Sequence, residues 1–255
     1  MKVIGAGFSK TGTKSLHTAL LKLGYCTVYD ALENAVYLED KWNTIFEKGW
    51  SIETFKKMYG NIDAVVDVPA FYFWEDIYKT FPDAKIILTV RDNEDVWFKS
   101  LKQHMECRDK ILTLHLLEWF SPSWKRTQVM RHNWGEIIYG DRYMFDSKWF
   151  GRKMNEQLIK LVYRQHNAYV LHKAPKTKLL VFNVKDGWEP LCKLVDVPVP
   201  DEPFPHTNVK GGIVQHWINT HPLVLKMKNE MKITLPSILI GAATLLGVLL
   251  YSKKW

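Results

Sequence analysis

The chain has 255 residues, of which 47% are hydrophobic and 24% are charged, so it can bury one sizeable core but not two. Its three cysteines, Cys26, Cys107 and Cys192, are too few and too far apart for a disulfide framework or a thiolate metal site. The net charge of +8 would suit an anionic ligand, an anionic membrane surface or nucleic acid, and charge alone does not choose among them.

The first predicted elements are a strand, a glycine loop and a helix. The strand covers residues 2–6, and the loop reads Gly-Phe-Ser-Lys-Thr-Gly-Thr-Lys-Ser over residues 7–15. Apolar residues then recur at helical spacing as far as Gly24. A glycine loop between a strand and a helix offers unpaired backbone N–H groups to an anion, so this segment is predicted to bind phosphate.

Several loop types compete for this segment. A dinucleotide-binding loop would place its third glycine at position 10, where Lys10 stands. A nucleoside-triphosphate P-loop would have lysine directly after Gly12, but Thr13 comes before Lys14 and Ser15, so the register differs by one residue. A plain tight turn is a further alternative, although two glycines, two lysines and four hydroxyls in nine residues argue for a ligand.

The rest of the chain continues to alternate between strands and helices. Further strands are predicted over residues 25–29, 62–68, 84–90 and 178–184. Two or three helices are predicted within residues 31–59, and single helices over residues 71–81, 92–105 and 188–195. This order predicts an α/β fold with three layers, in which helices flank both faces of a parallel, P-loop-like sheet.

Residues 106–150 fit this alternation least. They hold four tryptophans and several basic residues: Trp119, Trp124, Trp134 and Trp149, with Arg108, Lys125, Arg126, Arg131 and Arg142. We interpret the segment as a helical cap over the ligand site, suited to an apolar or anionic small molecule that would act as the acceptor of a transferred group. Tryptophans at irregular spacing are also typical of a simple core.

Asp67 is the candidate acid–base residue. It stands at the carboxyl end of an apolar strand, and ligands of parallel sheets bind beyond that end. It could take a proton from an acceptor hydroxyl. The apolar residues Ala64, Val65 and Val66 followed by Asp67 also resemble a Walker B carboxylate, which would indicate a kinase with Mg²⁺. The structural alternative is an N-cap before the helix at Phe71.

Four segments together resemble sulfotransferases that use 3'-phosphoadenosine 5'-phosphosulfate (PAPS). Residues 9–13 resemble the loop that binds the 5'-phosphosulfate. Residues 87–100 are similar to the strand-Arg-helix-Ser element that holds the 3'-phosphate, with one extra residue between Arg91 and Ser100. Residues 184–192 and 200–208 resemble the Gly-Trp-Glu-Pro-Leu-Cys and Pro-Phe-Pro-His signatures of an animal branch that includes parasite drug-activating sulfotransferases.

The resemblance implies sulfuryl transfer from PAPS to a hydroxyl or amine of a small molecule, with neither a metal nor nucleic acid. Lys10 would neutralise the leaving phosphate and Asp67 would be the base, although a solvated loop lysine is the alternative for Lys10. The implied cofactor-binding residues are Ser9, Lys10, Thr11, Gly12, Thr13, Lys14, Ser15, Arg91, Ser100, Gly187 and Trp188. Trp188 would lie near the adenine, or in the core. A P-loop kinase and a catalytically silent nucleotide-binding interaction protein remain alternatives.

The last predicted element is a membrane span. Residues 233–252 form a 20-residue run without charge, between Lys226, Lys228 and Lys232 on one side and Lys253 and Lys254 on the other. At ~1.5 Å per residue a helix of this length covers about 30 Å, the thickness of a hydrocarbon core. We expect a single tail anchor with Pro236 in its first turn, after a sulfotransferase-like domain of residues 1–230; a buried core helix is the alternative.

The same sequence predicts on which side of the membrane the domain lies. No N-terminal secretion signal is evident, Asn-x-Ser/Thr glycosylation sites are absent and cysteines are few. We therefore expect the domain to face the cytosol.

Overall fold

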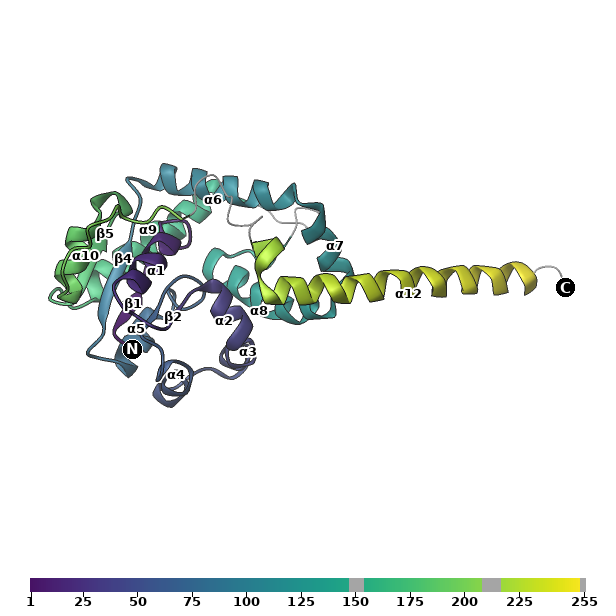
Figure 1. Ribbon diagram of the computed structural model, residues 1–255, viewed down its shortest axis with the longest axis horizontal. Helices are drawn as coiled ribbons and strands as arrows, with labels where there is room; N and C mark the ends of the chain where they lie inside the picture. The colour runs from purple at the N-terminus through teal and green to yellow at the C-terminus, as the bar shows by residue number, and fades with distance from the viewer. Residues whose placement is uncertain (147–153, 208–216, 253–255) are drawn as a thin grey trace.

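A computed structural model describes residues 1–146, 154–207 and 217–252 (Figure 1). Residues 147–150 of the predicted cap, including Trp149, lie outside the described residues, as do Asn208 and the lysines Lys253 and Lys254.

The centre of the fold is a five-stranded sheet in the order β2-β3-β1-β4-β5. The strands are β1 (Val3–Gly5), β2 (Val28–Tyr29), β3 (Ala64–Val65), β4 (Lys85–Thr89) and β5 (Leu179–Phe182). All pairings are parallel, and Val3 of β1 lies beside both Ala64 and Lys85. The predicted parallel α/β sheet is therefore confirmed, with strands shorter than the sequence suggested.

Helices cover both faces of this sheet, as predicted. Along β4, Ile86 and Leu88 face one buried cluster and Ile87 faces the other, because successive side chains of a strand point to opposite faces. Helices α1 (Thr13–Lys22) and α10 (Trp188–Val195) pack on the Ile87 side. The other side carries α5 (Trp74–Thr80), α6 (Glu94–Asp109) and α9 (Glu156–Lys173).

Three short helices lie between β2 and β3, where two or three were predicted. They are α2 (Ala31–Tyr37), α3 (Glu39–Lys48) and α4 (Ile52–Tyr59). Asp30 begins α2 with a capping box, in which its side chain accepts from the N–H of Leu32 and Glu33 accepts from the N–H of Asp30. These caps explain why a charged, aromatic segment still divides into discrete helices.

The described part of the predicted cap is helical. It comprises the end of α6 followed by α7 (Leu112–Phe120) and α8 (Pro122–Tyr139). Ser121 accepts a hydrogen bond from the N–H of Trp124 at the start of α8, and Pro122 takes the first helical position. Gly140 ends the helix with a φ of 67°.

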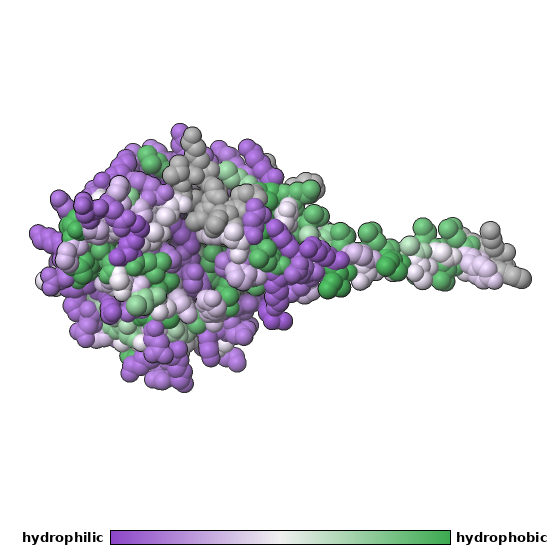
Figure 2. Space-filling model, viewed as in Figure 1, coloured by the Kyte–Doolittle hydropathy of each residue, from purple (hydrophilic) through white to green (hydrophobic). Residues whose placement is uncertain are grey.

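The C-terminal helix α12 (Pro222–Ser252) leaves the domain and projects away from it (Figure 1). It is long and apolar enough to cross a membrane, and its apolar stretch is unburied. Figure 2 shows this apolar stretch beside the largely hydrophilic surface of the domain.

The structure corrects one expectation about this helix. Pro236 was expected in the first turn of a helix that begins near residue 233, but it lies inside a 31-residue helix that begins at Pro222. The helix starts earlier because its first turns bury Met227, with Leu223 and Val224 beside it, against Leu117 of α7 and Trp124 of α8. This packing stabilises helical backbone before the apolar run begins.

Candidate active site

The glycine loop lies between β1 and α1, and two of its glycines are required by close contacts. Gly12 is the residue before α1 and has a φ of 110°, a conformation that side chains disfavour. A Cβ on Gly12 would lie 2.3 Å from Cγ1 of Val184. A Cβ on Gly7 would lie 2.0 Å from Oγ1 of Thr89. The loop is thus held tightly against two neighbouring strand ends.

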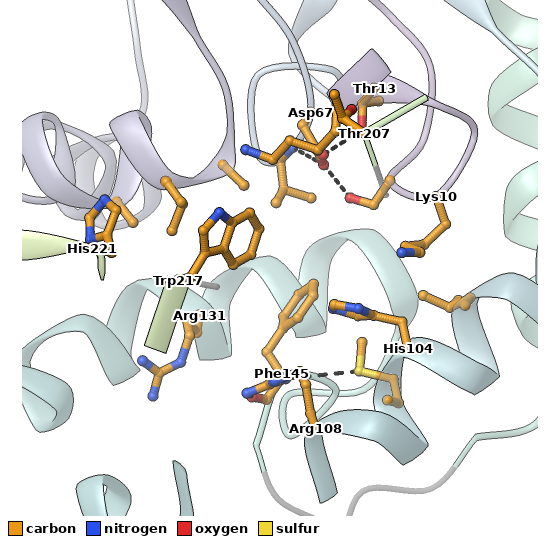
Figure 3. A pocket seen from close by; sticks show the side chains of 18 of the residues that line it. Lys10, Thr13, Asp67, His104, Arg108, Arg131, Phe145, Thr207, Trp217 and His221 are labelled. Atoms are coloured by element: carbon orange, nitrogen blue, oxygen red, sulfur yellow. Dashed lines mark hydrogen bonds between the residues drawn. The ribbon is translucent and has the colours of Figure 1, made fainter. Parts of the chain in front are cut away.

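A cavity of about 380 Å³ opens beside this loop (Figure 3). It lies beyond the carboxyl ends of the strands, where parallel sheets bind ligands. Its walls come from the glycine loop, α2, the segments that follow the strands, the cap from α6 to α8, and the start of α12 with the residues just before it. A volume of this size suits a small molecule, since ligand pockets measure about 300–1,000 Å³.

Lys10 points into this cavity (Figure 3). Its backbone is left-handed, with a φ of 72°. Its carbonyl oxygen accepts a hydrogen bond of 2.8 Å from Nε of Arg91, which fixes the loop to the end of β4. Burial lowers the pKa of the Lys10 ammonium, and the nearby Asp67 carboxylate opposes that change. Lys10 is therefore a partly desolvated cation aimed at the ligand space, rather than a solvated loop lysine.

Asp67 lies opposite the loop and also has a left-handed backbone, with a φ of 66°. One of its carboxylate oxygens accepts from the hydroxyl of Thr13 at 2.6 Å. The other accepts from the hydroxyl of Ser9 and, at 2.8 Å, from the N–H of Val68. Because α5 begins only at Trp74, Asp67 is not the N-cap of that helix. It lines the cavity and holds two hydroxyls of the glycine loop.

Lys14 is a second buried cation on the loop. Its ammonium pairs with the Asp30 carboxylate and lies 4.7 Å from the ring centre of Trp217. Burial lowers the pKa of Lys14 to about 8, while the Asp67 and Glu33 carboxylates act in the opposite direction. Lys14 therefore joins the loop to both α2 and the segment before α12.

Most of the predicted site residues come together around this cavity. Those that line it are Ser9, Lys10, Gly12, Thr13, Lys14, Ser15, Asp67, Arg91 and Ser100. Thr11 is fully buried instead, and its hydroxyl lies 2.5 Å from both the carbonyl oxygen of Phe8 and Oγ1 of Thr89. Its side chain therefore stabilises the loop from behind.

Gly187 and Trp188 lie elsewhere in the described structure. Trp188 is buried, donates from Nε1 to the carbonyl oxygen of Glu202 at 2.7 Å, and packs 4.9 Å from the ring of Phe204. Gly187 has a φ of 73° and begins α10. Neither residue lines the cavity, so packing accounts for Trp188, and an adenine contact stays a prediction.

Sequence reasoning missed two groups of lining residues. His104 on α6 was not singled out, nor were Trp217, Ile218 and His221 just before α12 or Leu223, Val224 and Met227 at its start. A signal for the second group existed, since apolar residues at 223, 224, 227 and 231 share one helical face before Lys232.

Arg131 of the cap also lines the cavity. It donates to Oγ1 of Thr127 at 2.6 Å and lies 4.2 Å from the ring centre of Trp124. Its Nε and Nη2 atoms are covered and have no hydrogen-bond partner in the part of the chain that the structure describes. Burial lowers the pKa of Arg131 to about 10, so the cap adds a buried cation to those of the loop.

His17, Asp30 and Glu33 form a group whose ligand atoms lie within 4.8 Å of one another, close enough for a metal ion. All three already have partners. Asp30 pairs with Lys14, Glu33 accepts from the N–H of Asp30, and Nε2 of His17 lies 3.2 Å from the carbonyl oxygen of Val28. The group serves to join α1 to α2.

Comparison with known proteins shows the family to which the chain belongs. A family model described as a sulfotransferase domain matches residues 2–213, which include the glycine loop, Asp67 and Arg91. The chain is 28% identical over 232 residues to Ava biosynthesis cluster protein M of Aspergillus versicolor, covering 87% of this chain and 86% of that protein. The match over most of the chain shows that this protein belongs to the sulfotransferase domain family.

Proposed function

We propose that the protein transfers the sulfuryl group of PAPS to a hydroxyl of a small-molecule acceptor. The observation that carries the proposal is that Lys10 and Asp67 line the same cavity. Both have left-handed backbones, and they are two of three non-glycine residues with positive φ in the described chain. Such conformations cost of order 1–3 kcal/mol each and cluster at active sites.

The cavity suits the anionic donor because Lys10, Lys14 and Arg91 line it beside the glycine loop. The N–H groups of the loop after Lys10 and the start of α1 would hold the 5'-phosphate. Arg91, which lines the cavity beside Lys10, would contact the 3'-phosphate together with Ser100 of α6, which also lines the cavity. When bound, PAPS supplies the sulfuryl group and a good leaving group, the 3',5'-bisphosphate.

In the transfer step, the acceptor oxygen attacks sulfur as the bond from sulfur to the 5'-phosphate oxygen breaks. The acceptor proton goes to Asp67, and the products are a sulfate ester and the bisphosphate. The Lys10 ammonium, which points into the cavity (Figure 3), would stabilise charge on the leaving oxygen, since such reactions depend mainly on position and electrostatics.

Asp67 supports sulfuryl transfer better than it supports the kinase alternative. Both of its oxygens accept from loop or backbone groups, namely Thr13, Ser9 and Val68. The loop also keeps the extra Thr13 that separates it from a nucleoside-triphosphate P-loop. These features favour the sulfate donor over a nucleotide with Mg²⁺.

The location of the protein follows from α12, a candidate membrane span. We propose that it anchors the protein by one C-terminal span, with the catalytic domain in the cytosol. The basic residues Lys226, Lys228 and Lys232 before the apolar stretch are suited to the lipid headgroups.

A screen of hydroxylated small molecules with radiolabelled PAPS tests the proposed activity. Label should pass to at least one acceptor, and Lys10→Ala should abolish the transfer. Binding of the bisphosphate without transfer to any acceptor would instead indicate a silent interaction protein. Phosphorylation of an acceptor by ATP-Mg²⁺ would indicate a kinase.

A further inference from the structure

One wall of the cavity lies outside the part of the chain that the family model matches. The family match ends at residue 213, whereas Ile218, Leu223, Val224 and Met227 line the cavity. Together with Leu114 and Trp124 of the cap they form a buried apolar cluster. We call these four residues the anchor wall. The matched residues 2–213 alone therefore leave this side of the cavity incomplete.

A polar clamp fixes the anchor wall to the cap. Glu230 of α12 accepts hydrogen bonds from Oγ of Ser121 at 2.8 Å, from the N–H of Ser123 at 2.9 Å and from Oγ of Ser123 at 2.5 Å. These groups form the N-terminus of α8, where a carboxylate is favoured by the helix dipole. The clamp sets α12 against the helix that carries Trp124 and Arg131.

The anchor wall is also close to the candidate membrane span. Helix α12 continues without interruption from Pro222 to Ser252. Ile233, the first residue of the uncharged run, is six positions after Met227, which corresponds to about 9 Å along a helix. The cavity therefore lies about two helical turns from the surface at which the span would enter lipid.

We propose that the acceptor is an aliphatic alcohol dissolved in the bilayer, and that its chain packs against the anchor wall with its hydroxyl toward Asp67. The wall is aliphatic and faces the cap, so it suits an alkyl chain. Relative to the free alcohol in water, each buried CH₂ group strengthens binding roughly four-fold, so a ten-carbon alcohol should bind at least about 100-fold more tightly than butanol at equal aqueous concentration. The reaction at the hydroxyl rests on the proposed function, whereas occupation of the wall does not.

The test uses the full chain in phosphatidylcholine vesicles with a diazirine-bearing dodecanol as a photoprobe. Light should attach the probe to peptides that contain residues 217–227 and to cap peptides around Leu114 and Trp134. Unlabelled decanol should compete, and butanol at the same concentration should not. Labelling confined to residues 233–252, without cap peptides, would overturn the proposal.

A matched pair of variants separates the wall from the rest of the helix. Val224 lines the cavity, while Leu225, the next residue, is exposed and does not. Val224→Trp should reduce cap labelling at least ten-fold, with Val224→Phe as the milder variant if the first fails to fold. Leu225→Trp should leave labelling unchanged. Equal labelling of both tryptophan variants would contradict the proposal.

Binding of the 3',5'-bisphosphate, measured by calorimetry on the same vesicles, keeps this test distinct from the test of the proposed function. Bisphosphate binding that is normal in Val224→Trp, together with lost labelling, supports the wall. If the wild-type chain labels as expected but does not bind the bisphosphate, the donor assignment fails and the anchor wall stands.

Discussion

At the scale of single residues, the left-handed backbones of Lys10 and Asp67 are the most informative feature of the site. Lysine and aspartate disfavour a left-handed backbone, whereas glycine would adopt it without strain. The contacts hold it in place, because Arg91 binds the carbonyl oxygen of Lys10 and the loop hydroxyls bind Asp67. These strained backbones lower the stability of the fold, and they place a cation and a carboxylate at one cavity.

Asp67→Asn tests the carboxylate. The amide keeps one oxygen for the Thr13 or Ser9 hydroxyl, so affinity for the bisphosphate should stay nearly intact. Turnover should fall about 100-fold or more, the usual scale for loss of a general base. Steady-state kinetics with radiolabelled PAPS provide the measurement, and Asp83→Asn at an exposed position is the control. Unchanged turnover would exclude Asp67 as the base.

Because His166 is buried beneath the loop, we predict that the stability of the protein depends on pH. Its Nε2 lies 2.7 Å from the carbonyl oxygen of Ala6, and burial lowers its pKa to about 4. The unfolded chain takes up this proton near pH 6.5, before the folded chain does. The contribution of His166 is therefore complete above pH 6.5 and is lost as pH falls toward 4, by roughly 3 kcal/mol in total.

Urea unfolding between pH 7 and pH 4 measures this effect. His166→Gln should flatten the pH dependence, whereas His172→Gln, at an exposed position on the same helix, should leave it as in the wild type. Identical slopes for the wild type and His166→Gln would show that other groups dominate.

At the scale of elements, the most important contact is the polar clamp between α8 and α12. Glu230→Ala removes three acceptor contacts at the N-terminus of α8, and loss of such a cap costs about 1–2 kcal/mol. Denaturant unfolding should detect this loss. Glu136→Ala, at the other end of α8, breaks an exposed pair with Arg142 and should change stability by well under 1 kcal/mol. Equal effects would mean that the clamp adds nothing beyond a surface pair.

The same elements show what the sequence could predict. The parallel sheet and the loop were readable because continuous apolar strands and a glycine-rich segment are local signals. The strand predicted over residues 62–68 shortened to β3 because Asp67 turns into a left-handed conformation, which only its tertiary contacts hold. Helix α9 was missed, since its buried face includes His166 and Lys160 among apolar residues.

The candidate site likewise contains residues that could be predicted from the sequence and residues that could not. The loop residues and Asp67 could be placed because strand ends of a parallel sheet converge. Trp188 could not, because a motif does not reveal which side of a helix faces a ligand and which faces the core. The anchor wall could not be predicted because the uncharged run begins only at residue 233, and the packing that forms the wall lies before it.

At the scale of the whole molecule, α12 is the candidate membrane span that would hold the domain at a membrane. Its uncharged stretch would be costly to expose to water at ~25 cal/mol per Å², and a helix satisfies its own backbone inside lipid. The full chain should therefore sediment with membranes and resist alkaline extraction, whereas a chain that ends at Lys232 should be released. Protease added to sealed vesicles should digest the domain, and its protection would place the domain in the lumen.

The central claim is that the cavity beside Lys10 is a PAPS site, and titration calorimetry with the 3',5'-bisphosphate tests it most directly. We predict that the wild-type chain binds the bisphosphate and does not bind ATP-Mg²⁺ comparably. Lys10→Ala should remove most of that binding, while Lys48→Ala at an exposed position should not change it. Tight binding of ATP-Mg²⁺ with no binding of the bisphosphate would contradict the account.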